Sequence, residues 1–276
     1  MSEGLKQRVI TAIAFGIPFL AALFYSDFTR IILLIVICIG SAIEYAGLQN
    51  KKWYRSPLHI LSLLTIIFLV LAVTIKYCPF VVTAIDFSSF HDILLYGGLA
   101  INSLFILDLF TGLFPIHKKA PWIANIIYAS LSYLILMSTS ATLLKVLFIS
   151  MIILIWVSDS SAYFVGRSIG KNKLMPSVSP GKTWEGFLGA GMITLIVGYV
   201  LSTFFTQYPM QSWILIALFV WLFGSIGDLV ESKFKRSIEI KDSGTLLPGH
   251  GGLLDRFDGF FFSIPFVVFL VEKILS

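Results

Sequence analysis

The chain has 276 residues, of which 57% are hydrophobic and 13% are charged. A soluble domain has about 45–50% apolar and about 25% charged residues, so this composition excludes an ordinary soluble protein. The net charge of +5 could suggest nucleic-acid binding, but in so apolar a chain it more often records membrane topology. We therefore expect an integral membrane protein that contacts membrane lipid and has no nucleic-acid partner.

Apolar stretches follow one another along the chain, and most are close to the roughly 20 residues that cross a bilayer as a helix. They cover residues 9–25, 28–48, 57–77, 93–114, 121–138, 142–165, 186–206, 211–230 and 258–275. The first resembles a signal peptide but lacks a small-residue cleavage site, so we expect it to be retained. The fourth is the least certain, because residues 79–92 before it form either a re-entrant segment or a loop. The pattern predicts an all-α polytopic membrane protein with about nine transmembrane helices.

The basic residues predict the orientation of these helices. All but Arg30, Lys76, Lys145 and Lys273 of the 20 Lys and Arg residues fall on one side of a nine-helix arrangement. Cytoplasmic loops carry the excess of Lys and Arg, so the N-terminus is expected to be cytoplasmic.

Two connections, 166–185 and 231–257, are long and polar, and both are expected on the cytoplasmic side. Between them, Gly186, Ala190, Thr194 and Gly198 repeat at a spacing of four, which is typical of close helix packing. We favour packing within the chain, and a homodimer contact stays open.

Carboxylates within apolar helices are costly and usually functional. Four lie within or at the ends of the predicted spans: Glu44, Asp108, Asp159 and Asp228. Glu231 follows Asp228 on the same helical face. An ion pair of Asp228 with Lys233 or Arg236 is the structural alternative to a functional role.

A glycine-rich segment, 241–258, follows these residues and contains Asp255 and Asp258 at a spacing of three. Carboxylates bind Mg²⁺ while leaving much of its coordination shell to phosphates and water. Basic side chains can then bind the remaining phosphate oxygens. The mixture predicts a site for a nucleoside triphosphate and an anionic partner.

Lys182, in the other polar connection, lies in Gly181-Lys182-Thr183 and suggests a phosphate-binding loop. That motif requires a glycine where this chain has Pro176, and a preceding strand that we do not expect in a helical membrane protein. We expect Lys182 to contact phosphate at the start of the next helix, where anions are favoured. Asp159 should face this connection from the preceding helix.

Residues 232–258 closely resemble the signature of the phosphatidate cytidylyltransferases, also called CDP-diacylglycerol synthases. The matching residues are Ser232-Lys-Phe-Lys-Arg236, Lys241-Asp-Ser-Gly244 and Leu247-Pro-Gly-His-Gly-Gly-Leu-Leu-Asp-Arg-Phe-Asp258. Segments 158–163 and 179–186 resemble two further blocks of the family. The first ~100 residues carry little specific signal. On this basis we divide the chain into N-terminal transmembrane helices over 1–114 and a catalytic region over 115–276.

The resemblance implies that CTP and phosphatidic acid react to give CDP-diacylglycerol and pyrophosphate, with Mg²⁺ required and a second metal ion left open. It assigns Mg²⁺ to Asp228 and Asp255, with Asp258 as a further catalytic candidate. The expected basic contacts to phosphate are Lys182, Lys233, Arg236 and Arg256. Candidate substrate-binding residues also include Asp159, Glu231, Lys241 and His250, although His250 could instead only fix the turn.

Two other functions remain open from the sequence. A CTP-dependent lipid-alcohol kinase of the polyprenol type would use the same nucleotide but release CDP. An ion transporter is less consistent, because the charges gather on one face and no inverted repeat is evident. For the favoured enzyme we expect the cytoplasmic membrane, with the site facing the cytoplasm.

Overall fold

The structure is a computed structural model that describes residues 3–49, 53–74, 88–115, 123–124, 127–240, 243–244 and 251–275. Its elements are nearly all helices. They are α1 (Glu3–Tyr25), α2 (Asp27–Gln49), the 3₁₀ helix η1 (Trp53–Arg55), α3 (Pro57–Thr74), α4 (Ser88–Thr111), the π-helix η3 (Ile127–Leu131), α7 (Ser132–Ser138), α8 (Ala141–Ile169), β1 (Lys173–Met175), β2 (Ser179–Thr183), α9 (Trp184–Phe204), α10 (Met210–Ser237), α11 (Leu254–Phe269) and the π-helix η4 (Leu270–Ile274).

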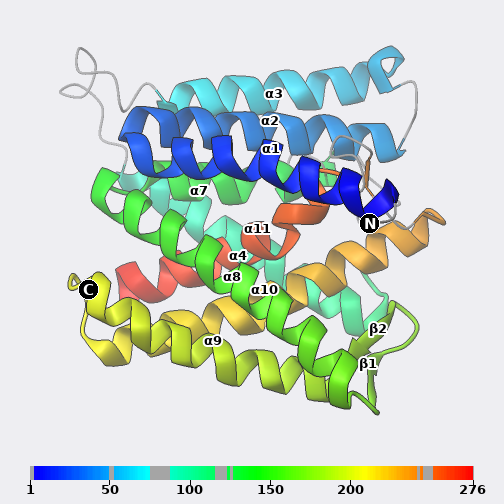
Figure 1. The fold of residues 1–276 in the computed structure, drawn as a ribbon. Helices are drawn as coiled ribbons and strands as arrows, with labels where there is room; N and C mark the ends of the chain where they lie inside the picture. Colours follow the sequence, from blue (N-terminus) through cyan, green and yellow to red (C-terminus); the bar gives the residue numbers. More distant parts are fainter. Residues whose placement is uncertain are drawn as a thin grey trace.

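The long helices run roughly side by side, with α11 in the middle of the bundle (Figure 1). Helices α1, α2 and α3 form one side of the molecule, and α9 lies on the other. The N-terminus, the β1–β2 hairpin and the C-terminal end of α10 share one end of the bundle, and the C-terminus lies at the opposite end. Which end faces the cytoplasm stays a prediction.

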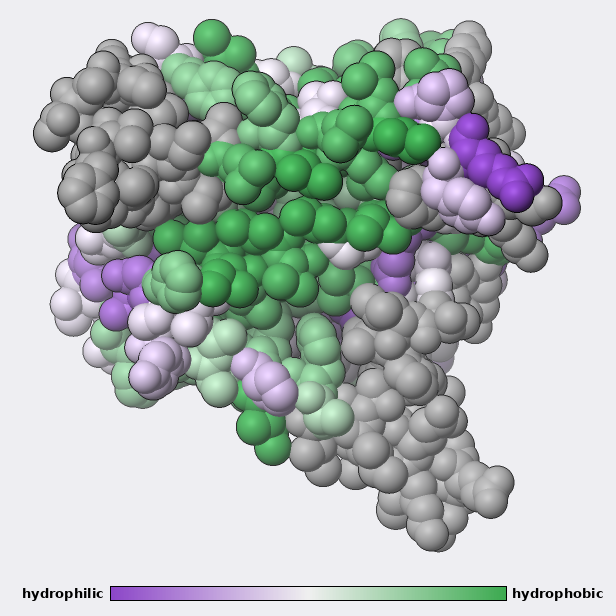
Figure 2. Space-filling model, turned by 90° about the horizontal axis from the view of Figure 1, so that it is seen from above, coloured by the Kyte–Doolittle hydropathy of each residue, from purple (hydrophilic) through white to green (hydrophobic). Residues whose placement is uncertain are grey.

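The surface of the bundle suits a bilayer. Figure 2 shows an apolar band across the face seen from above, with hydrophilic residues toward its two ends. Within the described residues, five helices are long and apolar enough to cross a membrane: 27–48, 89–111, 141–169, 184–204 and 210–237. The chain is therefore an integral membrane protein, whereas the count of nine crossings stays a prediction.

The fifth expected span, 121–138, is described as helix only from Ile127 onward, apart from residues 123–124. Every residue of α7 is buried. The described helix α7 therefore packs inside the bundle, and whether 121–138 crosses the membrane stays a prediction.

The two polar connections are more regular than expected. Helix α8 continues to Ile169, and β1 and β2 then pair as antiparallel strands, with Lys173 opposite Thr183. The expectation that no strand precedes α9 was therefore wrong, although Pro176 still excludes the phosphate-loop motif. Helix α10 likewise continues to Ser237, so residues 231–237 are helical and not part of a loop.

The small-residue face of α9 is used inside the molecule. Gly186, Ala190, Thr194 and Gly198 are all buried. An added Cβ at Gly198 would lie 2.5 Å from the Cβ of Ala217 on α10. Packing within the chain is thus confirmed for this face, and a homodimer remains a prediction without support from it.

Candidate active site

Asp228 and Asp258 lie where α10 and α11 pack closely together. An added Cβ at Gly259 would lie 2.9 Å from the carbonyl oxygen of Gly224, and one at Gly227 would overlap the side chain of Phe262. The helices can approach this closely because these positions lack side chains. Each aspartate is the neighbour in sequence of one such glycine, so close packing holds the two carboxylates on facing helices.

The β1–β2 hairpin brings Lys182 to this crossing. Thr183 caps α9 by accepting a hydrogen bond from the N–H of Gly186 (3.2 Å), and the N–H of Trp184 donates to the carbonyl oxygen of Asn172 (2.9 Å). With the hairpin held in this way, the Nζ of Lys182 lies 2.5 Å from Oδ2 of Asp228. Two residues predicted for the site, 46 positions apart in sequence, thus form an ion pair.

Asp159 approaches the same place from α8. Its carboxylate lies within electrostatic reach of Asp228, Lys182 and Arg256. A glycine contact also fixes this helix, since an added Cβ at Gly186 would lie 2.7 Å from the carbonyl oxygen of Ala162. The structure therefore places Asp159 beside the hairpin, as predicted.

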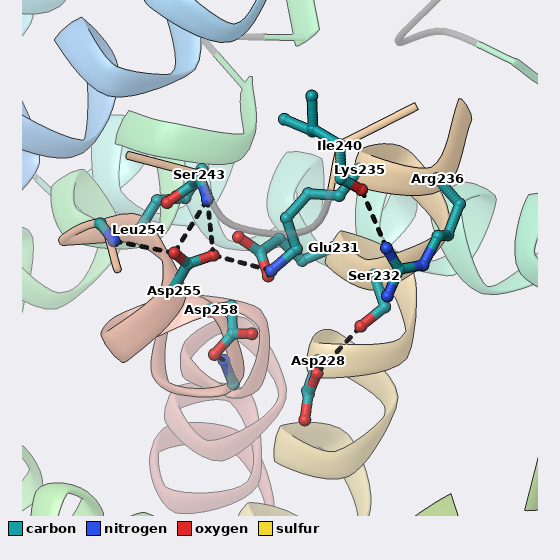
Figure 3. A network of polar contacts seen from close by, with 12 residues as sticks. Asp228, Glu231, Ser232, Lys235, Arg236, Ile240, Ser243, Leu254, Asp255 and Asp258 are labelled. Atoms are coloured by element: carbon teal, nitrogen blue, oxygen red, sulfur yellow. Dashed lines mark hydrogen bonds and ion pairs between the residues drawn. The ribbon is translucent and has the colours of Figure 1, made fainter. Parts of the chain in front are cut away.

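Asp255 has a dense set of hydrogen-bond donors (Figure 3). Its carboxylate accepts hydrogen bonds from the N–H of Ser243 (2.8 Å), the N–H of Gly252 (2.8 Å) and the ammonium of Lys235 (2.7 Å). Burial alone would raise the pKa of Asp255, but Lys235 and the two N–H groups outweigh burial and hold the pKa below its ordinary value. Asp255 is thus an oriented, ionised carboxylate.

Lys235 links Asp255 to Glu231. Its Nζ lies 2.5 Å from Oε2 of Glu231, one helical turn earlier on α10. The Glu231 side chain is 0% exposed, and among the described residues neither of its oxygens has a hydrogen bond of good geometry. The Lys235 ammonium is the cation described beside this carboxylate, which also lies near Asp258.

The set of charges was tested for its fit to Mg²⁺. Among the residues that the structure describes, five carboxylates (Asp159, Asp228, Glu231, Asp255 and Asp258) lie near three cations (Lys182, Lys235 and Arg256). An excess of carboxylates, including the buried Glu231, fits a hard divalent cation. No group of three potential ligands is already assembled for a metal within the described residues.

The geometry also refines the pairing of the aspartates. The α11 carboxylate within electrostatic reach of Asp228 is Asp258, whereas Asp255 contacts Lys235 and the N–H groups of Ser243 and Gly252. Figure 3 shows Asp255 and Asp228 at different levels of the two helices. Asp258 is therefore at least as well placed as Asp255 to share a ligand with Asp228.

Some predicted residues lie elsewhere. Lys233 is five positions after Asp228, about 140° around the helix, and its ammonium contacts the carboxylate of Asp108 on α4 (3.0 Å). This ion pair borders a cavity of about 230 Å³ between α4 and α10. Arg236 donates to the carbonyl oxygen of Ile240 (3.0 Å). Lys241 and His250 lie outside the described residues, so their roles stay predictions.

Lys235 is the central residue that sequence reasoning left out of the site. The available signal was its i, i+4 spacing from Glu231, which indicates an ion pair only where the chain is helical. Because residues 231–257 were expected to form a loop, the spacing of Glu231 and Lys235 did not predict an ion pair between them.

The sequence was then compared with known proteins. Residues 6–274 match the Cytidylyltransferase family. The chain belongs to the cytidylyltransferase family. It is 32% identical over 273 residues to a phosphatidate cytidylyltransferase of Staphylococcus aureus (strain COL), covering 97% of this chain and 99% of that protein.

Shorter stretches of the chain are more similar to other members of the family. A phosphatidate cytidylyltransferase of Bacillus subtilis (strain 168) is 52% identical over 124 residues, which is 43% of this chain and 45% of that protein. One of Staphylococcus saprophyticus is 40% identical over 163 residues, or 58% of this chain and 62% of that protein. These two alignments span less than two thirds of the relatives' lengths, whereas the Staphylococcus aureus alignment spans nearly all of both chains.

Proposed function

We propose that the protein transfers CMP from CTP to phosphatidic acid, giving CDP-diacylglycerol and pyrophosphate for phospholipid biosynthesis. One observation carries the proposal: the family match covers almost the whole chain. The matched range includes every residue of the cluster formed by Asp159, Lys182, Asp228, Glu231, Lys235, Asp255, Arg256 and Asp258. The named relatives act on phosphatidate, and a polar cluster at one end of an apolar bundle suits a reaction between a soluble nucleotide and a lipid.

The reaction is an in-line displacement. An oxygen of the lipid phosphate attacks the α-phosphorus of CTP and forms a new P–O bond. The bond from the α-phosphorus to the oxygen bridging the α- and β-phosphates breaks, and pyrophosphate leaves with that electron pair. The attacking phosphate is already ionised at neutral pH, so no protein base is required. Such transfers depend on positioning and charge neutralisation.

The cluster supplies both requirements. When CTP binds, the ammonium of Lys182 leaves the carboxylate of Asp228 and contacts the phosphates of CTP. Together with Arg256, it neutralises negative charge on the leaving pyrophosphate. Asp228 would hold Mg²⁺ together with one or both of the α11 carboxylates, Asp255 and Asp258. Mg²⁺ held there would supply positive charge that offsets the charge of the phosphate oxygens. Lys235 keeps Asp255 and Glu231 oriented.

The placement of the cluster gives each substrate its own route. We propose that the end of the bundle bearing the hairpin faces the cytoplasm, which is where CTP is found, in the cytoplasmic membrane. Phosphatidate would enter sideways from the bilayer. Asp255 and Asp258 lie in the first turns of α11, and Lys182 lies just before α9, which supports this arrangement over an ion-transport pathway.

Two labels on CTP test the proposal with purified protein, Mg²⁺ and phosphatidate in detergent micelles. Label on the α-phosphorus should enter the lipid phase, and label on the γ-phosphorus should appear as pyrophosphate. Entry of the γ-label into lipid with release of CDP would instead show a lipid kinase. Absence of either product under turnover conditions would reject both enzymes.

A further inference from the structure

A carboxylate on α2 contacts the segment that leads into α11. Oε2 of Glu44 accepts a hydrogen bond from the N–H of Leu254 (2.8 Å), the first residue of α11, across 210 positions of sequence. The first N–H groups of a helix have no partner within the helix, and negative charge is favourable there. Glu44 therefore caps the helix that carries Asp255 and Asp258.

The surrounding residues are shaped to accept this contact. An added Cβ at Gly244 would lie 2.7 Å from Oε1 of Glu44, and one at Gly252 would lie 2.6 Å from Oε2. One turn before Glu44, an added Cβ at Gly40 would lie 2.7 Å from the side chain of Leu253. The same face of α2 thus meets the segment twice, at positions where glycine leaves the necessary space.

The segment that Glu44 contacts also supplies the donors to Asp255. The N–H groups of Ser243 and Gly252 bind the Asp255 carboxylate, and residues 244 and 252 are the ones that abut Glu44. We propose that Glu44 is a positioning residue for the transfer reaction. It holds the backbone of residues 243–244 and 252–254 in place, so that Asp255 stays oriented toward Lys235. This inference rests on the proposed function.

Substitutions at Glu44 separate positioning from simple charge. Glu44→Ala and the shorter Glu44→Asp should both lower kcat more than tenfold, with KM for CTP and phosphatidate within threefold of wild type. Glu44→Gln should stay within threefold of wild-type kcat, because its amide oxygen still reaches the Leu254 N–H. Glu44→Gln as inactive as Glu44→Ala would overturn the inference, as would a raised KM with unchanged kcat. Asp27→Asn, at the other end of α2, is the matched control.

A double-mutant cycle with Gly244 gives the sharper test. Gly244→Ala should displace the end of the Glu44 side chain and lower kcat as Glu44→Ala does. In the Glu44→Ala background the same change should cost little more, because the obstructing oxygens are gone. Gly252→Ala should be harmful in both backgrounds, since its added Cβ also meets Ser243 and the backbone N of Gly244. Additive effects of Glu44→Ala and Gly244→Ala would contradict the inference.

The same double-mutant cycle can be measured by thermal unfolding, without any substrate. Thermal unfolding midpoints of the four proteins in detergent should show the same non-additivity. An inactive wild type with a coupled cycle would overturn the proposed function and leave the Glu44 contact in place. An active wild type with an additive cycle would overturn the contact alone.

Discussion

Replacing Lys182 by methionine separates the effect of its charge on kcat from its effect on the stability of the fold. The Lys182 and Asp228 side chains are 28% and 34% exposed. Ion pairs with this much exposure contribute about 0.2–1 kcal/mol to stability, so Lys182→Met should unfold only slightly more easily than wild type. In the proposed reaction the ammonium would meet charge on the departing pyrophosphate. Loss of one such contact typically costs about 10²–10³ in kcat, or roughly 2.7–4 kcal/mol.

The assay is initial-rate transfer of α-labelled CMP to phosphatidate, measured beside thermal unfolding in the same detergent. Lys273 provides the matched control, because it forms a similar ion pair with Asp92 (2.9 Å) at the opposite end of the bundle. Lys273→Met should leave kcat unchanged. The reasoning is refuted if Lys182→Met keeps near-wild-type kcat, or if Lys273→Met lowers kcat as much as Lys182→Met does.

Three further changes test the geometry of the site. The pKa of Asp255 lies below its ordinary value of 3.8, so its ionised form stabilises the fold above about pH 4, and this contribution is lost as pH falls further. Asp255→Asn should therefore be less stable than wild type by about 1.5–3 kcal/mol at pH 7, with the gap closing below about pH 4 in pH-dependent unfolding. Gly259→Ala should force α10 and α11 apart, cost about 1–3 kcal/mol and lower activity, whereas Gly97→Ala, with open space at its Cβ, should be neutral in unfolding assays. Lys233→Met and Asp108→Asn should be non-additive in unfolding by about 0.5–3 kcal/mol, and additivity would show that their ion pair carries no weight.

The helices were largely predictable because apolar stretches of membrane length carry a strong signal. Each predicted stretch overlaps a helix of the part of the chain that the structure describes, with ends that differ by several residues in places. For 121–138, of which 127–138 is described as helix, hydropathy does not distinguish a buried core helix from a spanning one, so this crossing stays a prediction. Both are apolar on all sides, and only length and packing separate them.

The candidate site was predictable in its residue types but less so in its pairings. Asp228, Asp255, Asp258, Lys182 and Asp159 were all singled out, and the structure brings them close to one another or to their shared partners. The ion pair of Lys182 with Asp228 depends on the β1–β2 hairpin. Its strands have only three and five residues, which is too short to give a clear strand pattern in the sequence.

Other contacts depend on how far helices extend and which faces meet. The extension of α10 through Ser237 decides that Lys235 faces the site while Lys233 turns toward Asp108. The contact of Glu44 with Leu254 joins residues 210 positions apart, and no local pattern could have shown it. Long-range packing of this kind is what a single sequence does not contain.

The most direct test of the account is transfer of α-labelled CMP from CTP to phosphatidate by wild type and by Asp228→Asn. The substitution preserves side-chain shape and should leave the fold nearly intact. We predict label in CDP-diacylglycerol with wild type and loss of at least 10³ in rate with Asp228→Asn. Equal rates from the two folded proteins, or no lipid label from wild type, would contradict the account.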